Sequence, residues 1–352
     1  MRFWSLESLL VICVACSSLS WAASKKKKKG DEEPVTQTLD FPKDPPAAIV
    51  ADASRMTFFI SPLSAKGLLS AQIRDAIRSL LGQSRGAQIV KLRAFVAGSG
   101  DMRRVPSLVS EIFTDKRLPL PAVTVVQVGA LPLTGAQVLI EATAVDRKPI
   151  NPNGLAFIGG QPGSASGVGD RLASMLARAS IRAESVRQVT CFLDGLEFES
   201  SVREQIATAY PRAPAAYVQL RRDSAGEYTE CEAVTALENI PVTAGSGGAV
   251  TFVGPVRVVL TGAQMGFGGE DKDIALAFDR LGRALEGVGA SWKSVVMANT
   301  YALSNGIRRK VGAARNVLGK SEQPGTGLSL VFEGLPSVDA SFAIDAVAYV
   351  ER

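Results

Sequence analysis

The sequence predicts an α+β fold of three tandem domains, each with the element order β-β-α-β-α-β-β. The 352-residue chain is 46% hydrophobic, which is enough to bury a large core and to form more than one domain. One layout of apolar segments occurs three times along the chain, and internal repeats indicate repeated structural units. We expect the domains at residues 49–148, 151–238 and 247–352, with the polar "NPN" at 151–153 and the Gly-rich "AGSGG" at 244–248 as connections.

Each copy opens with an extended apolar run, near Met56, Leu155 and Ala249, and continues with a helix. In the first and third copies the apolar residues recur at the spacing of one helical stripe. These residues are Leu69, Ile73, Ile77 and Leu80 in the first copy and Ile274, Phe278, Leu281, Leu285 and Val288 in the third.

A β-like segment follows each of these helices and places Phe95, Phe192 and Tyr301 at matching positions. A second helix is expected around residues 105–113, 202–210 and 307–318, and a pair of strands closes each copy.

The three closing strands, "VLIEATAV", "YTECEAVTA" and "FAIDAVAYV", place Glu141, Glu232 and Asp345 at the same step. Two helices per copy cover one face of a sheet and leave the other face open. The natural cover is the other copies, so we expect one monomeric chain to form a pseudo-trimer around a central axis.

The N-terminus predicts export to the periplasm or beyond the cell. Residues 1–22 have the layout of a secretory signal peptide, with Arg2, an apolar run and small residues before a cut at Ala23. A competing interpretation is a lipoprotein with Cys16 lipidated. Residues 23–48, rich in Lys and Pro, are expected to be a disordered linker.

Removal of the signal peptide leaves two cysteines, Cys191 and Cys231, on strand-like stretches of one predicted domain. Exported proteins often pair such cysteines, but sequence does not give the sheet order. A disulfide and two buried free thiols both remain open.

Composition excludes several classes of function. The chain has no histidine, which removes Ser-His and Cys-His nucleophiles and zinc sites that need imidazole, so we expect no metal and no cofactor. The net charge is +5 and only 6% of residues are aromatic, with no basic and aromatic cluster on a folded module, so we expect no nucleic-acid partner. The apolar run near the N-terminus is too short for a membrane span.

The segments "DIALAFDRLGRALEGVGASWKSVVMANTYAL" and "LPAVTVVQVGALP" followed by "VLIEATAV" resemble the RidA family, also called YjgF or L-PSP-like. The resemblance covers about residues 50–352 as three diverged copies. It implies a chorismate-mutase-like fold, homotrimeric in the family, and hydrolysis of 2-imino or 2-enamino acids to 2-keto acids. It also implies a site between neighbouring subunits, where an arginine clamps the substrate carboxylate and a glutamate on the last strand positions water.

This chain departs from the family at both positions. The places that correspond to the arginine and the glutamate hold Val123 and Leu139 in copy one, Ala215 and Glu230 in copy two, and Gly327 and Ala343 in copy three. Only copy two keeps the glutamate, and its nearest arginine is Arg212. The candidate catalytic residues are therefore Glu230, Arg212 and Tyr217. Two alternatives remain open: Arg212 is a solvated loop residue, and Glu230 is half of an ion pair between copies.

Two functions follow from this pattern. The first is a non-catalytic or altered pseudo-trimer that binds a small organic acid or a protein partner. The second is an imine or enamine deaminase that uses one surviving cleft. Ribonuclease activity, suggested by the older L-PSP name, would need general acid-base groups and phosphate contacts that we do not find.

Overall fold

The computed structural model describes residues 43–222, 228–241, 249–318 and 325–351. The predicted signal peptide, 1–22, and most of the predicted linker, 23–48, lie outside these ranges. Among the described helices, none has the length and apolar character needed to cross a bilayer. The fold is of the α+β class, as the sequence predicts.

Sheet 1 has the strand order β2-β5-β3-β4 and carries two helices. β3 pairs with β4 in parallel and with β5 antiparallel. Its elements are β2 (Met56–Ile60), α1 (Leu69–Gln83), β3 (Gln88–Ala97), α2 (Arg104–Asp115), β4 (Ala122–Val128) and β5 (Val138–Val145).

Sheet 2 has the order β10-β6-β9-β7-β8, again with one parallel pair, β7 and β8. Its elements are β6 (Leu155–Ile158), α3 (Val168–Arg178), β7 (Val186–Leu193), α4 (Glu199–Ala209), β8 (Ala215–Gln219), β9 (Thr229–Ala236) and β10 (Val250–Val253).

Sheet 3 has the order β1-β11-β15-β13-β14, with β12 also paired to β15. Its elements are β1 (Ala48–Asp52), β11 (Arg257–Thr261), β12 (Gln264–Phe267), α5 (Asp271–Glu286), β13 (Val295–Ala302), α6 (Asn305–Leu318), β14 (Ser329–Val331) and β15 (Ala340–Tyr349). Short 3-10 turns occur at Ala53–Arg55, Ala165–Gly167, Ala183–Ser185, Leu196–Phe198 and Trp292–Ser294.

Two edge strands differ from the sequence expectation. β1 opens the first predicted domain, 49–148, but pairs with β11 of sheet 3. β10 opens the third, 247–352, but pairs with β6 of sheet 2. The element order of the second segment also has one strand before its helix instead of two, while the third has three. Edge strands satisfy their backbone groups with whichever edge lies nearest, and an apolar run does not specify that neighbour.

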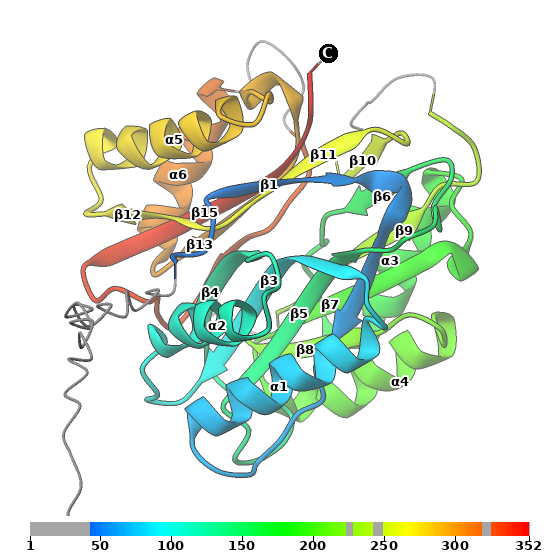
Figure 1. Cartoon of the computed structure of the whole chain (residues 1–352). Coiled ribbons are helices and arrows are strands. Elements are labelled where there is room, and N and C mark those ends of the chain that lie inside the picture. The colour runs from blue at the N-terminus through cyan, green and yellow to red at the C-terminus, as the bar shows by residue number, and fades with distance from the viewer. Residues whose placement is uncertain (1–42, 223–227, 242–248, 319–324, 352) are drawn as a thin grey trace, which may run out of the picture. The chain divides into compact units, whose positions relative to one another are not determined.

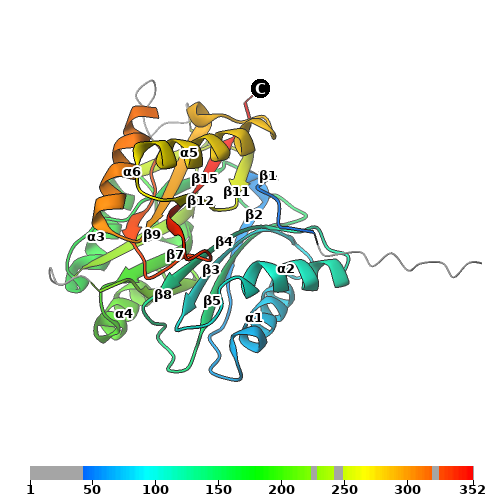
Figure 2. The same ribbon diagram turned by 90° about the vertical axis from the view of Figure 1, so that its left-hand side faces the viewer.

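Each sheet is covered on one face by its own two helices (Figure 1, Figure 2). The predicted stripes form these covers, since Leu69, Ile73, Ile77 and Leu80 are buried against sheet 1. Ile274, Phe278 and Leu281 are buried against sheet 3 in the same way, whereas Val288 lies beyond the end of α5. The other faces of the three sheets meet one another, because one buried cluster contains residues from β4, β8 and β14 together.

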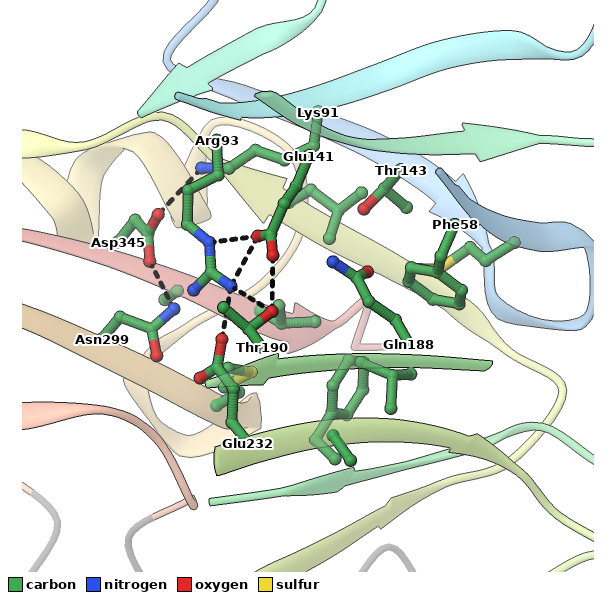
Figure 3. A pocket seen from close by; sticks show the side chains of 18 of the residues that line it. Phe58, Lys91, Arg93, Glu141, Thr143, Gln188, Thr190, Glu232, Asn299 and Asp345 are labelled. Atoms are coloured by element: carbon green, nitrogen blue, oxygen red, sulfur yellow. Dashed lines mark hydrogen bonds and ion pairs between the residues drawn. The ribbon is translucent and has the colours of Figure 1, made fainter. Parts of the chain in front are cut away.

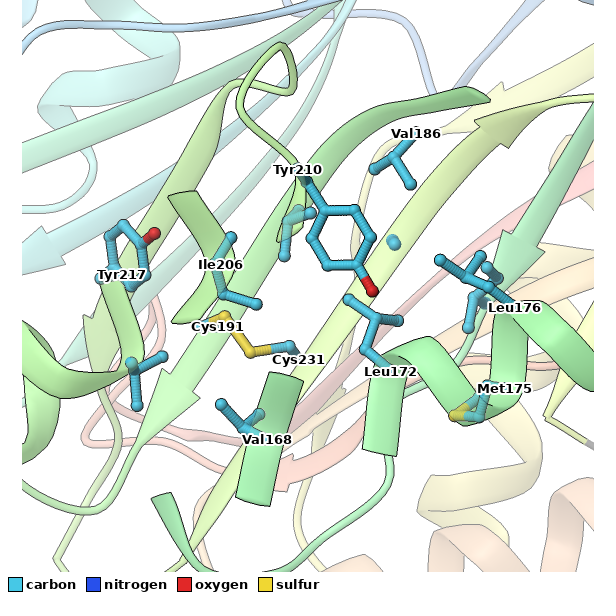
Figure 4. Close-up of a cluster of buried hydrophobic side chains, with 14 of the residues drawn as sticks. Val168, Leu172, Met175, Leu176, Val186, Cys191, Ile206, Tyr210, Tyr217 and Cys231 are labelled. Carbon is cyan, nitrogen blue, oxygen red and sulfur yellow. A yellow bond between two sulfur atoms is a disulfide. The ribbon is translucent and has the colours of Figure 1, made fainter. Parts of the chain in front are cut away.

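The helix-covered core of sheet 2 contains a disulfide (Figure 4). Cys191 on β7 lies directly opposite Cys231 on β9, with a Cα–Cα distance of 4.1 Å, and their sulfurs are bonded. Of the two alternatives that the sequence leaves open, the structure shows the disulfide.

Candidate functional site

The three sheets meet through strands that carry their side chains in matched layers. Residues two apart on a strand point to the same face, so Arg93 and Phe95 of β3 both face the other sheets. Arg93 is paired with Glu141, and Phe95 with Leu139. The corresponding pairs are Thr190 with Glu232 and Phe192 with Glu230 in sheet 2, and Asn299 with Asp345 and Tyr301 with Ala343 in sheet 3.

The aromatic layer closes one side of this meeting region, which we call the junction. Phe95, Phe192 and Tyr301 are fully buried in one apolar cluster with Phe332. The ring of Phe192 meets Phe95 edge-on at a centroid distance of 6.0 Å and Phe332 at 6.2 Å. The residues that the sequence places at matching positions therefore pack in one layer.

The next layer is charged and is held together by Arg93 (Figure 3). The Nε of Arg93 donates to Glu141 Oε2 at 2.7 Å, and its Nη2 donates to Glu232 Oε1 on sheet 2. Thr190 donates its hydroxyl to Glu141 Oε1, which links sheet 2 back to sheet 1. The Arg93 guanidinium also lies over the ring of Phe95, 5.2 Å from its centroid.

Lys91 of sheet 1 makes the corresponding link to sheet 3. Its Nζ donates to Asp345 Oδ2 at 2.9 Å and to Thr124 Oγ1 at 2.6 Å. Asn299 donates to the other oxygen of Asp345, Oδ1, at 2.9 Å. Burial alone raises the pKa of Asp345, but the charge of Lys91 and the hydrogen bonds from Thr124 and Lys91 outweigh it and hold this pKa below its ordinary value.

Glu232 is the least compensated carboxylate of the junction. Its residue is 6% exposed, and its Oε2 has no hydrogen-bond partner among the described residues. Burial raises the pKa of Glu232 to about 7, because it outweighs the charge of Arg93, and the charge of Glu141 adds to the rise.

Glu232 lines a cavity of about 90 Å³ at the junction. The cavity combines the charged layer with the amide of Gln188, the hydroxyl of Thr143 and the rings of Phe58 and Phe157. Such a cavity can hold a small polar molecule, and a carboxyl that titrates near neutral pH can accept or release a proton there.

Sequence reasoning noted the shared step of Glu141, Glu232 and Asp345 but missed Lys91 and Arg93. The available signal was the stretch "IVKLRAFVAG", in which two cations alternate with apolar residues inside a strand. Charges at alternate positions of a buried strand, on the face that also carries Phe95, indicate a buried polar layer.

Comparison with known proteins finds one family model that matches part of the chain. Residues 69–146 match the family model described as Endoribonuclease L-PSP, from the start of α1 to the end of β5. This segment is similar to the L-PSP family. The family resemblance seen in the sequence is thereby confirmed for sheet 1. No match to a curated protein was found.

Three solved structures illustrate what else the chain is similar to. A YjgF/YER057c/UK114 family member from Mycobacterium tuberculosis is 22% identical over 28% of this chain and 86% of that chain, with a TM-score of 0.25. The Rid-family protein YyfB of unknown function from Yersinia pestis is 18% identical over 29% and 85%, with a TM-score of 0.27. RidA from an Antarctic Psychrobacter is 18% identical over 26% and 80%, with a TM-score of 0.24.

The positions that the L-PSP resemblance assigns to the arginine lie at one step of the three sheets. Val123 is paired with Leu92 and Ala215 with Val189, on β3 and β7. Gly327 lies against the backbone of Ala298 on β13, since a Cβ on Gly327 would be 2.0 Å from the carbonyl oxygen of Ala298. None of these positions carries a cation.

The structure does not bring the three sequence-predicted catalytic residues together. Tyr217 is paired with Cys191 and packs in the helix-covered core, with the guanidinium of Arg203 4.4 Å from its ring centroid. Glu230 is paired with Phe192, whose side chain faces the opposite side of sheet 2. Arg212 is exposed in the connection between α4 and β8.

Glu230 lies instead at a second meeting point, between sheet 2 and sheet 3. Its Oε2 accepts a hydrogen bond from the Tyr228 hydroxyl. Its Cγ packs closely against Gly160, because a Cβ on Gly160 would lie only 1.9 Å from that Cγ. Burial raises the pKa of Glu230, while the Tyr228 hydroxyl and the charge of Arg308 on α6 act against the rise. The cation that acts on the pKa of Glu230 is therefore Arg308 on α6, a helix of sheet 3, and not Arg212.

Proposed function

We propose that the chain is an exported binding protein of the Rid type, in which three tandem diverged domains form an intramolecular pseudo-trimer. In this proposal the clefts between the sheets bind a small organic acid or a protein partner and do not hydrolyse imino acids. The shared strand order of the three sheets and the matched layers of their junction support the tandem arrangement.

The proposed loss of catalysis rests on one observation: Val123, Ala215 and Gly327 stand at the three positions where the family resemblance places an arginine. A clamp for a substrate carboxylate needs a guanidinium aimed into the cleft, because its planar fork matches the two oxygens. Gly327 cannot be replaced by an arginine without rearrangement, since its φ is +148° and a Cβ would strike the carbonyl of Ala298. Val123 is packed at the edge of an apolar core.

The energetic consequence for catalysis is large. Misplacing a positioning group by about 1 Å costs on the order of a hundredfold in rate, and here the cation is missing at all three positions. The apolar pattern of the core is kept while the arginine positions have lost their cation. This combination is expected when a fold is maintained and its catalytic activity is not.

The test is a coupled assay in which an amino-acid oxidase generates 2-iminopropanoate and the loss of the imine is followed. We expect the rate of imine loss with the full chain to equal the rate without it. Circular dichroism of the same sample verifies that the protein is folded. Acceleration of imine loss that scales with protein concentration would contradict the proposal.

A second candidate function, imine or enamine deamination, is favoured by the surroundings of Glu230. Its buried carboxyl has a raised pKa, a tyrosine hydroxyl on one oxygen and the charge of Arg308 from another sheet. Such a carboxyl can exchange protons with a water molecule. Arg308 would bind the carboxylate of the substrate from a position other than that of the family's arginine.

This alternative makes its own prediction in the same assay. Any activity would be lost in Glu230→Gln and reduced in Arg308→Met, while Arg212→Met, an exposed arginine outside this meeting point, would leave it unchanged. Activity that is retained in Glu230→Gln would exclude this cleft as its source.

A further inference from the structure

We propose that the junction cavity binds a small ammonium cation, of the size of ammonium or methylammonium, with its N–H groups directed at Glu232. The lining of this cavity includes neither Glu230 nor any of the three arginine positions, and the inference does not rest on the proposed function. Four features of the cavity carry it: its charge, one free oxygen, its size and its walls.

The charges that line the cavity do not balance. Lys91 and Arg93 supply two positive charges, whereas Glu141, Glu232 and Asp345 supply three carboxylates. A buried uncompensated charge is strongly unfavourable, so the third carboxylate requires either a proton or a bound cation.

The free oxygen identifies which carboxylate needs the cation. Both oxygens of Glu141 are occupied, by Thr190 and by Arg93, and both oxygens of Asp345 accept hydrogen bonds from Asn299 and Lys91. Glu232 uses only Oε1, and its buried Oε2 has no partner in the described part of the chain. Buried polar atoms are almost always hydrogen-bonded, which makes this oxygen the acceptor for a bound donor.

The size and walls of the cavity select the class of cation. A cavity of about 90 Å³ is well above the smallest void that holds one water, so a small ammonium ion has room there. Gln188 and Thr143 offer further oxygen acceptors, and the rings of Phe58 and Phe157 provide faces that attract cations. A single free carboxylate oxygen suits an ammonium ion better than a divalent metal, which takes six or more oxygens.

A proton competes with this cation for Glu232. The groups that act on the carboxyl are Arg93 on β3, Glu141 on β5 and Glu230 on its own strand. Because its pKa lies near 7, the carboxylate is free for a cation at pH 8 and is protonated at pH 5.5.

The experiment measures the thermal midpoint of the full chain at pH 8 in ammonium, methylammonium, sodium and tetramethylammonium chloride at equal ionic strength. We expect ammonium and methylammonium to raise the midpoint relative to sodium, by about 5 °C at a hundredfold excess over the dissociation constant. Tetramethylammonium, which has no N–H group to donate to Glu232, should match sodium. The increase should disappear at pH 5.5.

The matched variants are Glu232→Gln, which removes the charge in the cavity, and Glu333→Gln, which removes an exposed charge outside it. The increase with ammonium should vanish in the first and persist in the second. Equal midpoints in all four salts at pH 8 would show that a proton alone neutralises the junction, and an undiminished increase in Glu232→Gln would place the cation elsewhere. Either result overturns the proposal, and the wild-type comparison at two pH values decides it even if Glu232→Gln does not fold.

Discussion

At the scale of single residues, burial and charge oppose each other at Glu232. The carboxyl accepts a hydrogen bond from Arg93 on one oxygen but lies in the buried junction, and burial raises its pKa from 4.5 to about 7. A carboxyl with a higher pKa in the folded than in the unfolded chain binds its proton more tightly when folded. Its contribution to stability is complete below about pH 4.5 and is lost as the pH rises through 7.

Because the pKa of Glu232 is raised by folding, the stability of the chain should depend on pH. Between pH 4.5 and pH 8, the free energy of unfolding of the wild type should fall because of Glu232 by up to about 3 kcal/mol, the equivalent of its pKa shift. Glu232→Gln should flatten this fall in urea titrations in sodium buffers, while Glu333→Gln should keep it. An unchanged slope in Glu232→Gln would show that Glu232 does not titrate in this range.

The second prediction concerns Arg93. Arg93→Met would leave Glu141 and Glu232 buried without their shared cation, and breaking a buried ion pair from one side costs about 3–5 kcal/mol. Arg103→Met removes an arginine whose ion pair with Asp101 is exposed, and we expect no measurable change in stability. Denaturant titration of both variants compares the two cases, and equal losses would argue against the structural role of the charged layer.

At this scale the sequence predicts part of the site. The shared step of Glu141, Glu232 and Asp345 follows from the repeat, and the structure places all three at the junction. The inter-sheet partners Lys91 and Arg93 do not follow from it, because copies two and three have Gln188 and Thr190 or Met297 and Asn299 at those steps. The sequence does not show that Tyr217 and Glu230 face opposite sides of sheet 2, or that Arg212 is exposed in a connection, because this depends on the pairing of the strands.

At the scale of elements, helices are well predicted and edge strands are not. The stripe from Leu69 to Leu80 and the second helices near 105–113, 202–210 and 307–318 correspond to α1, α2, α4 and α6. Helical spacing is a local property, so sequence alone reveals it. The pairing of β1 with sheet 3 and of β10 with sheet 2 depends on which edge lies closest in the folded chain, and no local pattern contains that information.

The third prediction belongs to the paired strands β7 and β9. The disulfide between Cys191 and Cys231 closes a sequence separation of 40 residues, and its removal should cost about 4 kcal/mol on the chain-entropy account. We expect Cys191→Ala/Cys231→Ala to unfold at a lower denaturant concentration than the wild type, and reductant to lower the wild-type midpoint without affecting the double variant.

Thiol counting provides the control for this prediction. Mass spectrometry of the non-reduced protein after alkylation should find Cys191 and Cys231 unmodified. Two alkylated thiols would show that the cysteines are free in solution.

At the scale of the whole molecule, the junction makes the three sheets unequal. Both of its cations, Lys91 and Arg93, come from sheet 1, while the carboxylates come from all three sheets. Three identical subunits could not produce this asymmetry, because each would carry the same residues. In the proposed single-chain pseudo-trimer each copy can diverge separately, and only copy two keeps a glutamate, Glu230, at the position that the family resemblance gives to it.

The central claim is therefore that one chain supplies all three sheets of the assembly. Native mass spectrometry of the purified protein, with the solution mass checked by light scattering, tests it most directly. The account predicts the mass of one chain at all protein concentrations, and the Arg93→Met variant should lose stability but remain a single chain. A stable particle of three chains would contradict the claim, since it would mean that the sheets pack between chains and not within one.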